Sequence, residues 1–168
     1  MWYVIQVRTG QEEKIKMQCQ KNIASDVLRE CFIPYYEEQK HIKGKWETQK
    51  KILFSGYVFL DTEEIMQLYA DLKQVSGLTK LLKTGEEVIP LTEKEMGFLD
   101  SFGGQKKIVS VSEGIIENAK IIIKSGPLVG MERYIRKIDR HKRRAFLEVP
   151  MFGGIQRVQV GLEIVSKT

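Results

Sequence analysis

The 168-residue chain has only two cysteines, Cys19 and Cys31, and no apolar run that approaches the ~20 residues of a membrane-spanning helix. So few cysteines do not suit a disulfide-stapled secreted fold. The first residues carry no basic head and no small-residue cleavage site, so we expect no signal peptide. These absences predict a reduced cytoplasmic protein with no membrane association.

Sequence patterns typical of catalysis and metal binding are also missing. The chain has no G-x-S-x-G, no phosphate-cradling P-loop and no H-E-x-x-H. Its two histidines, His41 and His141, lie far apart in basic turns, and its cysteines lack C-x-x-C spacing. We therefore predict a protein that is not an enzyme and that uses no cofactor or metal. An enzyme that relies on Cys31 or His41 is the least favoured alternative.

Charge is distributed unevenly along the chain. Residues 1–104 have a net charge of −2, whereas residues 105–168 have a net charge of +7. This asymmetry indicates two units, the smaller of which meets a polyanion. The glycine- and lysine-rich stretch that starts at Gly103 is the best linker. We predict a first domain over 1–102, a linker over 103–113 and a second domain over 114–168.

The first domain is predicted to alternate strands and helices. Apolar patterns predict strands over 2–7, 31–36, 51–60 and 78–82, and helices over 12–22 and 63–75, the second capped by Thr62. Thr92 and Glu95 form a capping box that starts a third helix. The resulting β-α-β-β-α-β order is that of the split βαβ, or ferredoxin-like, unit.

The second domain is predicted to consist of short strands. These strands cover 120–124, 134–138, 144–149, 155–160 and 163–165, with turn residues such as Gly126, Gly130, Gly153-Gly154 and Gly161 between them. Five short strands favour a small β-barrel, because closing a sheet removes its exposed edges. The fold class is therefore predicted to be α+β.

The strongest local signal is a dense run of positive charge, residues 133–144, which we call the basic segment. Seven of its twelve residues are Arg or Lys and one is Asp. Such a hairpin would bind a polyanion by counterion release, and arginine adds two-point contacts and stacking. The candidate nucleic-acid-binding residues are Arg133, Arg136, Lys137, Arg140, His141, Lys142, Arg143 and Arg144. The alternative is a solvated hairpin.

A weaker basic stretch, Lys40 to Lys51, suits a solvated loop and a DNA-touching loop equally well.

A third signal is aromatic. The segment Leu53-Phe54-Ser55-Gly56-Tyr57-Val58-Phe59 has more aromatic side chains than one strand face can bury. Exposed aromatic side chains would mark a partner site, whereas packing in the core is the more common outcome.

Three motifs resemble those of the NusG family. Trp2-Tyr3-Val4 followed by Gly10 and a helix resembles the opening of its N-terminal domain, and Phe54-Ser55-Gly56-Tyr57-Val58 resembles its F-x-G-Y-V segment. Gly126-Pro127-Leu128-Val129-Gly130 resembles the start of a KOW motif. The resemblance implies a ferredoxin-like NusG N-terminal (NGN) domain, followed by an SH3-like β-barrel with a KOW motif. It also implies binding to bacterial RNA polymerase.

The resemblance implies roles for individual residues. Phe54, Tyr57 and Phe59 would contact the polymerase clamp helices, and Arg8 would approach the non-template DNA strand. Gly126 and Gly130 would form the KOW turn, in which Arg133 stands where a third glycine is usual. The basic hairpin most resembles LoaP, a specialised antiterminator paralogue of certain Gram-positive bacteria.

Together, the sequence patterns and the resemblance predict a monomeric transcription elongation and processive antitermination factor. It would bind RNA polymerase through its first domain and nucleic acid, a structured hairpin of nascent leader RNA, through its second. One alternative is a general NusG-like elongation factor whose KOW domain binds protein. Another is a ribosome-associated KOW protein that binds RNA.

Overall fold

The computed structural model describes residues 1–75 and 88–168. Its internal contacts group the chain into two compact units, one of residues 1–33 and 54–96 and the other of residues 34–53 and 97–168. Each unit is described by itself below. The predicted domain limits, 1–102 and 114–168 with a linker over 103–113, stay a prediction.

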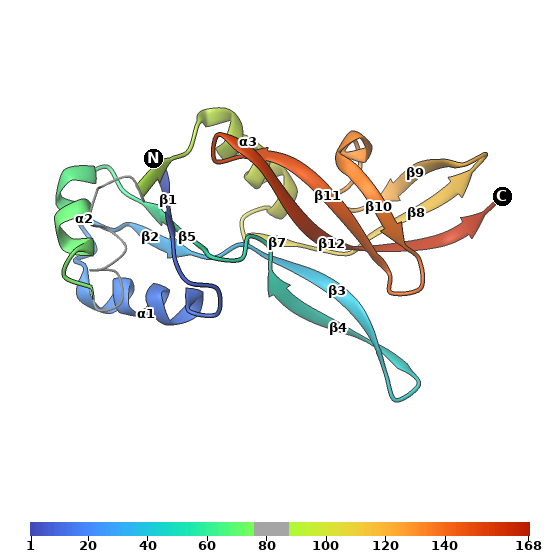
Figure 1. The fold of residues 1–168 in the computed structure, drawn as a ribbon, viewed down its shortest axis with the longest axis horizontal. Helices are drawn as coiled ribbons and strands as arrows, with labels where there is room; N and C mark the ends of the chain where they lie inside the picture. The colour runs from blue at the N-terminus through green and yellow to red at the C-terminus, as the bar shows by residue number, and fades with distance from the viewer. Residues whose placement is uncertain (76–87) are drawn as a thin grey trace. The chain divides into compact units, whose positions relative to one another are not determined.

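The first unit contains a four-stranded antiparallel sheet (Figure 1). Its strands are β1 (Trp2–Gln6), β2 (Glu30–Phe32), β5 (Tyr57–Asp61) and β6 (Val88–Pro90), in the order β2-β5-β1-β6. All neighbours are antiparallel, as the split βαβ unit requires. The strand predicted over 78–82 lies outside the described residues, and β6 was not predicted.

Two helices accompany this sheet. Helix α1 (Glu12–Asn22) packs on β2 and β5 and buries Ile15 and Cys19, four residues apart as predicted. Helix α2 (Ile65–Leu72) buries Leu68 and Leu72. The prediction that Thr62 caps this helix is wrong, because the helix begins three residues later. The Thr62 hydroxyl instead accepts the Glu64 N–H at 2.9 Å and donates to the Val27 carbonyl at 2.5 Å.

A third helix, α3 (Glu93–Gly103), starts in the first unit and ends in the second. Its capping box is confirmed: the Glu95 N–H donates to the Thr92 hydroxyl at 3.1 Å, and the Thr92 N–H donates to the Glu95 carboxylate at 3.0 Å. Within residues 1–75 and 88–168, none of the helices could span a membrane.

The two strands predicted over 31–36 and 51–60 are each broken in two. β2 ends at Phe32 and β3 (Tyr35–Ile42) follows, while β4 (Lys45–Ile52) precedes β5. Pro34 has no N–H to give to a ladder, and the Ser55-Gly56 turn interrupts the return. Strands β3 and β4 form a hairpin in the second unit, and β3 also pairs in parallel with β7 (Ile108–Val109).

The second unit also holds a five-stranded sheet in the order β10-β11-β12-β8-β9. Its elements are β8 (Ser112–Glu117), β9 (Lys120–Ser125), the 3₁₀ helix η1 (Glu132–Tyr134), β10 (Ile135–Asp139), β11 (Arg144–Met151) and β12 (Gly154–Lys167). The mixed α+β class is confirmed. The pairings among the described residues run from β10 to β9 and do not close into a barrel.

Gly161 was predicted as a turn residue, and this prediction is wrong. It lies inside β12, so the strands predicted over 155–160 and 163–165 are a single strand. A Cβ at Gly161 would lie 2.5 Å from the Glu37 carbonyl oxygen on β3. Glycine is therefore required here by the close approach of two backbones.

Candidate interaction surfaces

The basic segment forms η1, β10, a tight turn and the start of β11 in the second unit (Figure 1). The Lys142 N–H donates to the Asp139 carboxylate at 2.9 Å across the turn, and this bond holds the pKa of Asp139 below its usual range. Arg143 closes the turn with a φ of +54°. The one acidic residue of the segment therefore shapes the turn that presents the cations.

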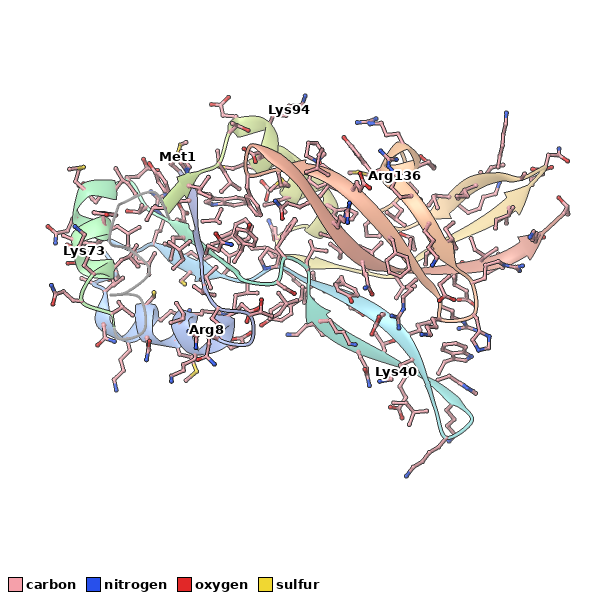
Figure 2. All side chains as sticks on the ribbon, viewed as in Figure 1. Met1, Arg8, Lys40, Lys73, Lys94 and Arg136 are labelled. Atoms are coloured by element: carbon pink, nitrogen blue, oxygen red, sulfur yellow. The ribbon has the colours of Figure 1, made fainter. Side chains whose placement is uncertain are left out.

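Six candidate residues of the basic segment are exposed to solvent: Arg133, Arg136, Lys137, Arg140, His141 and Lys142. Arg136, labelled on β10 in Figure 2, donates to the Arg133 carbonyl at 2.7 Å and lies 3.8 Å from the Glu148 carboxylate. Within the part of the chain that the structure describes, the side chains of Arg140, His141 and Lys142 form no ion pair or hydrogen bond. The tip of the turn thus presents cations that are open to a polyanion.

The other two candidates, Arg143 and Arg144, are half-buried and turn toward the β3–β4 hairpin. The Arg143 guanidinium donates to the Gln39 side-chain oxygen at 2.7 Å, and its Nη1 lies 3.5 Å from the Glu163 carboxylate. The Arg144 Nη2 lies 3.8 Å from the Glu38 carboxylate. The structure therefore divides the basic segment into an exposed part and a part engaged within the protein, which the charge pattern did not predict.

Glu38 is the centre of this internal contact. Its side chain is 1% exposed and lies between Lys51 Nζ, at 3.0 Å, and Arg144. Burial, followed by the charge of Glu38, raises the pKa of the neighbouring Tyr36 hydroxyl. A buried carboxylate is costly unless cations compensate it. Arg144 therefore has a structural role in addition to any contact with a ligand.

We expect Arg144→Ala to lower the free energy of unfolding, because it removes one of the two cations that compensate buried Glu38. Breaking a buried pair costs about 3–5 kcal/mol, and the remaining Lys51 reduces the expected loss to roughly 1–3 kcal/mol. Arg140→Ala, at an exposed position of the same turn, is the control and should change stability by less than about 0.5 kcal/mol. Thermal melting measures both variants, and equal melting of the two would contradict the assigned role.

The two predicted KOW glycines both have positive φ, +97° at Gly126 and +79° at Gly130. A Cβ at Gly126 would lie 2.6 Å from the Ser112 Cα, and the buried Ser112 hydroxyl accepts the Leu128 N–H at 3.0 Å. Gly126 is therefore needed for both its conformation and its packing. Arg133, in place of a third glycine, lies in η1, where no positive φ is required.

The aromatic candidates of the first unit are placed differently from one another. Phe54 and Phe59 are 3% and 0% exposed, with ring centroids 6.0 Å apart, and Phe59 stacks on Phe32 at 5.2 Å. These two rings belong to the core, the alternative that the sequence left open. Tyr57 is partly exposed at the start of β5 and is the accessible member of the three.

Arg8 and Tyr57 lie at the same end of the first sheet. Tyr57 pairs with Gln6, and the Val7 N–H donates to the Gly56 carbonyl at 2.7 Å. Arg8 follows β1 and is exposed (Figure 2). The sequence predicted separate roles for these residues, and the β1–β5 ladder places their segments side by side.

Sequence reasoning missed Glu12, which organises this end of the sheet. Its side chain is 2% exposed, and its carboxylate accepts the Gly10 N–H at 2.6 Å and the Gly56 N–H at 3.0 Å. The carboxylate therefore joins the loop after β1 to the turn before Tyr57. A glutamate in the first turn of a helix is so common that no local signal distinguishes this one.

Cys31 and His41, the residues of the enzyme alternative, each contact another side chain. Both cysteines are buried, and a hydrogen bond with Cys19 together with burial raises the pKa of the Cys31 thiol, which disfavours the reactive thiolate. His41 stacks on Trp46, with ring centroids 5.0 Å apart. Among residues 1–75 and 88–168, no cluster of three His, Cys, Asp or Glu side chains could hold a metal ion.

Comparison with known protein families gives a match over more than half of the chain. The profile of the family described as "NusG: Transcription termination factor nusG" matches residues 1–100. The chain belongs to the NusG family.

Full-length relatives extend the match beyond the profile. The NusG-family chain is 28% identical over 174 residues to the transcription termination/antitermination protein NusG of Staphylococcus aureus strain Mu50, across 99% of this chain and 94% of that protein. The protein of the same name from strain N315 matches equally well. The sequence similarity therefore extends over both units.

A solved structure gives the corresponding match in fold. The structure described as "Domain interaction in Thermotoga maritima NusG" aligns with a TM-score of 0.57, covers 95% of this chain and 92% of that one, and is 20% identical. At this identity the match concerns the fold alone, and it agrees with the mixed α+β architecture of the NusG-family chain.

Proposed function

We propose that this NusG-family protein is a processive antitermination factor of the LoaP type that binds bacterial RNA polymerase and a structured leader RNA. The RNA part of the proposal is supported by the tip of the basic segment, where the side chains of Arg140, His141 and Lys142 are exposed and form no ion pair or hydrogen bond within the described residues. A turn of this kind can neutralise several phosphates at once. Arginine adds planar contacts that suit a folded RNA.

The proposal assigns different roles to the two predicted domains. The NGN domain, 1–102, docks on the polymerase clamp helices through the surface around Tyr57, and Arg8 approaches the non-template DNA strand. Residues 114–168 act as the KOW domain, an SH3-like barrel that captures the RNA. The factor works as a monomer without a cofactor and without catalysis. By holding the clamp closed, the docked domain disfavours pausing and termination, and RNA capture directs it to particular operons.

The RNA part is tested by binding of the full chain to an RNA hairpin and to duplex DNA of equal length over a salt series. Tight binding to the hairpin at physiological salt supports the proposal. If about four phosphates are contacted, the slope of log affinity against log salt is roughly −3 to −4. Weak binding to both nucleic acids that vanishes near ~0.15 M salt would refute the RNA part.

The polymerase part is tested at Tyr57. We expect Tyr57→Ala to abolish co-purification with core RNA polymerase, because Tyr57 is the one partly exposed aromatic side chain of the three candidates. Substituting buried Phe54 or Phe59 would damage the core and confuse binding with unfolding.

Tyr69→Ala is the matched control, since Tyr69 is also a partly exposed tyrosine but lies on α2. It should retain the polymerase, and both variants should melt near the temperature of the unmodified protein. A Tyr57→Ala variant that still co-purifies with polymerase would show that the docking surface is assigned wrongly.

A general NusG-like elongation factor is the second candidate. It is favoured by the full-length match to relatives named for termination and antitermination. In that case the KOW domain binds a protein. The full chain would not bind the RNA hairpin at physiological salt but would still co-purify with RNA polymerase. A ribosome-associated RNA-binding protein would instead sediment with ribosomes and not with polymerase.

A further inference from the structure

Trp46 on β4 is a large apolar side chain that remains 39% exposed. It lies directly opposite His41 on β3, and their ring centroids are 5.0 Å apart at an interplanar angle of 38°. The Arg143 guanidinium carbon lies 3.8 Å from the Trp46 ring centroid. Three flat groups from β3, β4 and the basic segment thus meet at one place within the second unit.

This stack is held in place on its Arg143 side. The Arg143 guanidinium also donates to the Gln39 side-chain oxygen at 2.7 Å and faces Glu163 at 3.5 Å. Because the Arg143 guanidinium is already held over the indole ring, the two side chains lose less conformational entropy when a ligand binds. The stack is therefore preorganised, whereas an isolated exposed tryptophan would not be.

The charge around the stack is predominantly positive. Lys43, in the turn of the same hairpin, is exposed, whereas Lys40 (labelled in Figure 2) and Lys45 are the sequence neighbours of His41 and Trp46 and therefore lie on the opposite face. Glu47 is the residue after Trp46, so its side chain also lies on the face of β4 opposite to Trp46. Glu163 is the acidic group that faces the stack, and Arg143 offsets it.

An aromatic ring stacked with a guanidinium of the basic segment matches the chemistry of an unpaired nucleobase and its phosphates. Bases that are splayed from a loop stack on Trp, His and Arg planes, while bases within a duplex have no free face. We propose that Trp46, with His41 and Arg143, forms a stacking site for an unpaired base of the RNA that the basic segment holds. This inference rests on the proposed RNA binding and adds a base-contacting site on the β3–β4 hairpin.

The test follows the fluorescence of Trp46 in the full chain. The protein has two tryptophans, and Trp2 packs on Phe32 at 5.1 Å, so Trp2→Phe leaves Trp46 as the sole emitter. The probes are an RNA hairpin with an unpaired loop, a fully paired RNA duplex of equal length, and a DNA hairpin of the same sequence. We expect the RNA hairpin to quench the emission in step with binding, and the duplex to leave it nearly unchanged. Quenching by the DNA hairpin alone would overturn the assignment to RNA.

Affinity measurements with labelled RNA complete the test. Trp46→Ala should weaken hairpin binding by roughly 5- to 150-fold, the range expected for loss of one stacked base, and should change duplex binding by less than about twofold. Trp46→Phe should restore most of the hairpin affinity. Ile155→Ala removes another exposed apolar side chain of the second unit and should have no effect.

The outcomes separate this site from the proposed function. If Trp46→Ala binds the hairpin like the unmodified protein, while loss of the exposed cations of the basic segment abolishes binding, the stacking site is wrong and RNA binding stands. If the unmodified protein binds neither hairpin nor duplex at physiological salt, both the site and the proposed RNA binding are wrong.

Discussion

Replacing Arg136, Lys137, Arg140 and Lys142 together with alanine is expected to lower the affinity for an RNA hairpin by roughly 100- to 500-fold at ~0.15 M salt. All four side chains are exposed, and each can neutralise one phosphate. The estimate follows from counterion release, in which each lost phosphate contact removes about 0.7–0.9 from the log–log salt slope. The slope should therefore become shallower by roughly 3. Binding measured at four or more salt concentrations gives both quantities.

A charge-matched variant separates local contacts from overall charge. Replacing four exposed lysines of the first unit, Lys14, Lys21, Lys73 and Lys94, changes the net charge by the same amount. This control should retain most of the affinity and most of the slope, because those lysines lie outside the basic segment. Equal losses in the two variants would show that the protein attracts RNA through its net charge alone.

Arg143 and Arg144 are left out of this substitution for a structural reason. The charge pattern treats all cations of the basic segment alike, since it contains no information about which groups face them. Glu38 is 1% exposed and pairs with Arg144, and Gln39 accepts from Arg143. Both partners lie about 100 residues earlier in the chain. Contacts of such sequence separation leave no trace in local periodicity, so sequence reasoning overestimated the accessible charge.

Helix α1 and the start of helix α3 could be predicted from local pattern because both have local causes. The Ile15–Cys19 spacing and the Thr92–Glu95 capping box act within one or two helical turns. The β3–β4 hairpin could not be predicted to this degree. Its place in the second unit depends on pairing with β7 and on packing against β12, which are long-range contacts.

Glycine shows the same difference between local and long-range causes. Gly126 and Gly130, which the sequence predicted as turn residues, both adopt positive φ. Gly161 was also predicted as a turn residue, but it lies inside strand β12. The Glu37 carbonyl oxygen of β3, 2.5 Å from the site of a Cβ, and the Val111 side chain, 2.9 Å from it, explain the glycine. A turn glycine and a close-approach glycine are identical in sequence and are distinguished by their neighbours.

Glu12→Ala is expected to produce the largest loss of stability of any single substitution considered for the first unit. The change leaves the N–H groups of Gly10 and Gly56 without their acceptor, at 2.6 and 3.0 Å from the present carboxylate. Each unsatisfied buried donor costs about 1–3 kcal/mol, so the free energy of unfolding should fall by roughly 2–5 kcal/mol. The melting temperature should fall by roughly 5–15 °C.

Glu13→Ala is the matched control for this prediction. Glu13 also lies in the first turn of α1, where a carboxylate interacts equally with the helix dipole, but it is exposed. The control should therefore melt within a few degrees of the unmodified protein. Melting of the two variants at the same temperature would mean that the dipole, and not the two buried hydrogen bonds, accounts for the contribution of Glu12.

The same substitution connects stability to polymerase binding. Glu12 holds the Gly56 turn that precedes Tyr57 and the loop that follows Arg8, so its loss should displace both candidate contacts. We expect Glu12→Ala to weaken co-purification with RNA polymerase at temperatures where the protein is still folded, although Tyr57 itself is intact. Glu12→Gln keeps one acceptor oxygen and should show an intermediate loss in both measurements. Full retention of polymerase by a folded Glu12→Ala variant would place the docking surface away from this end of the sheet.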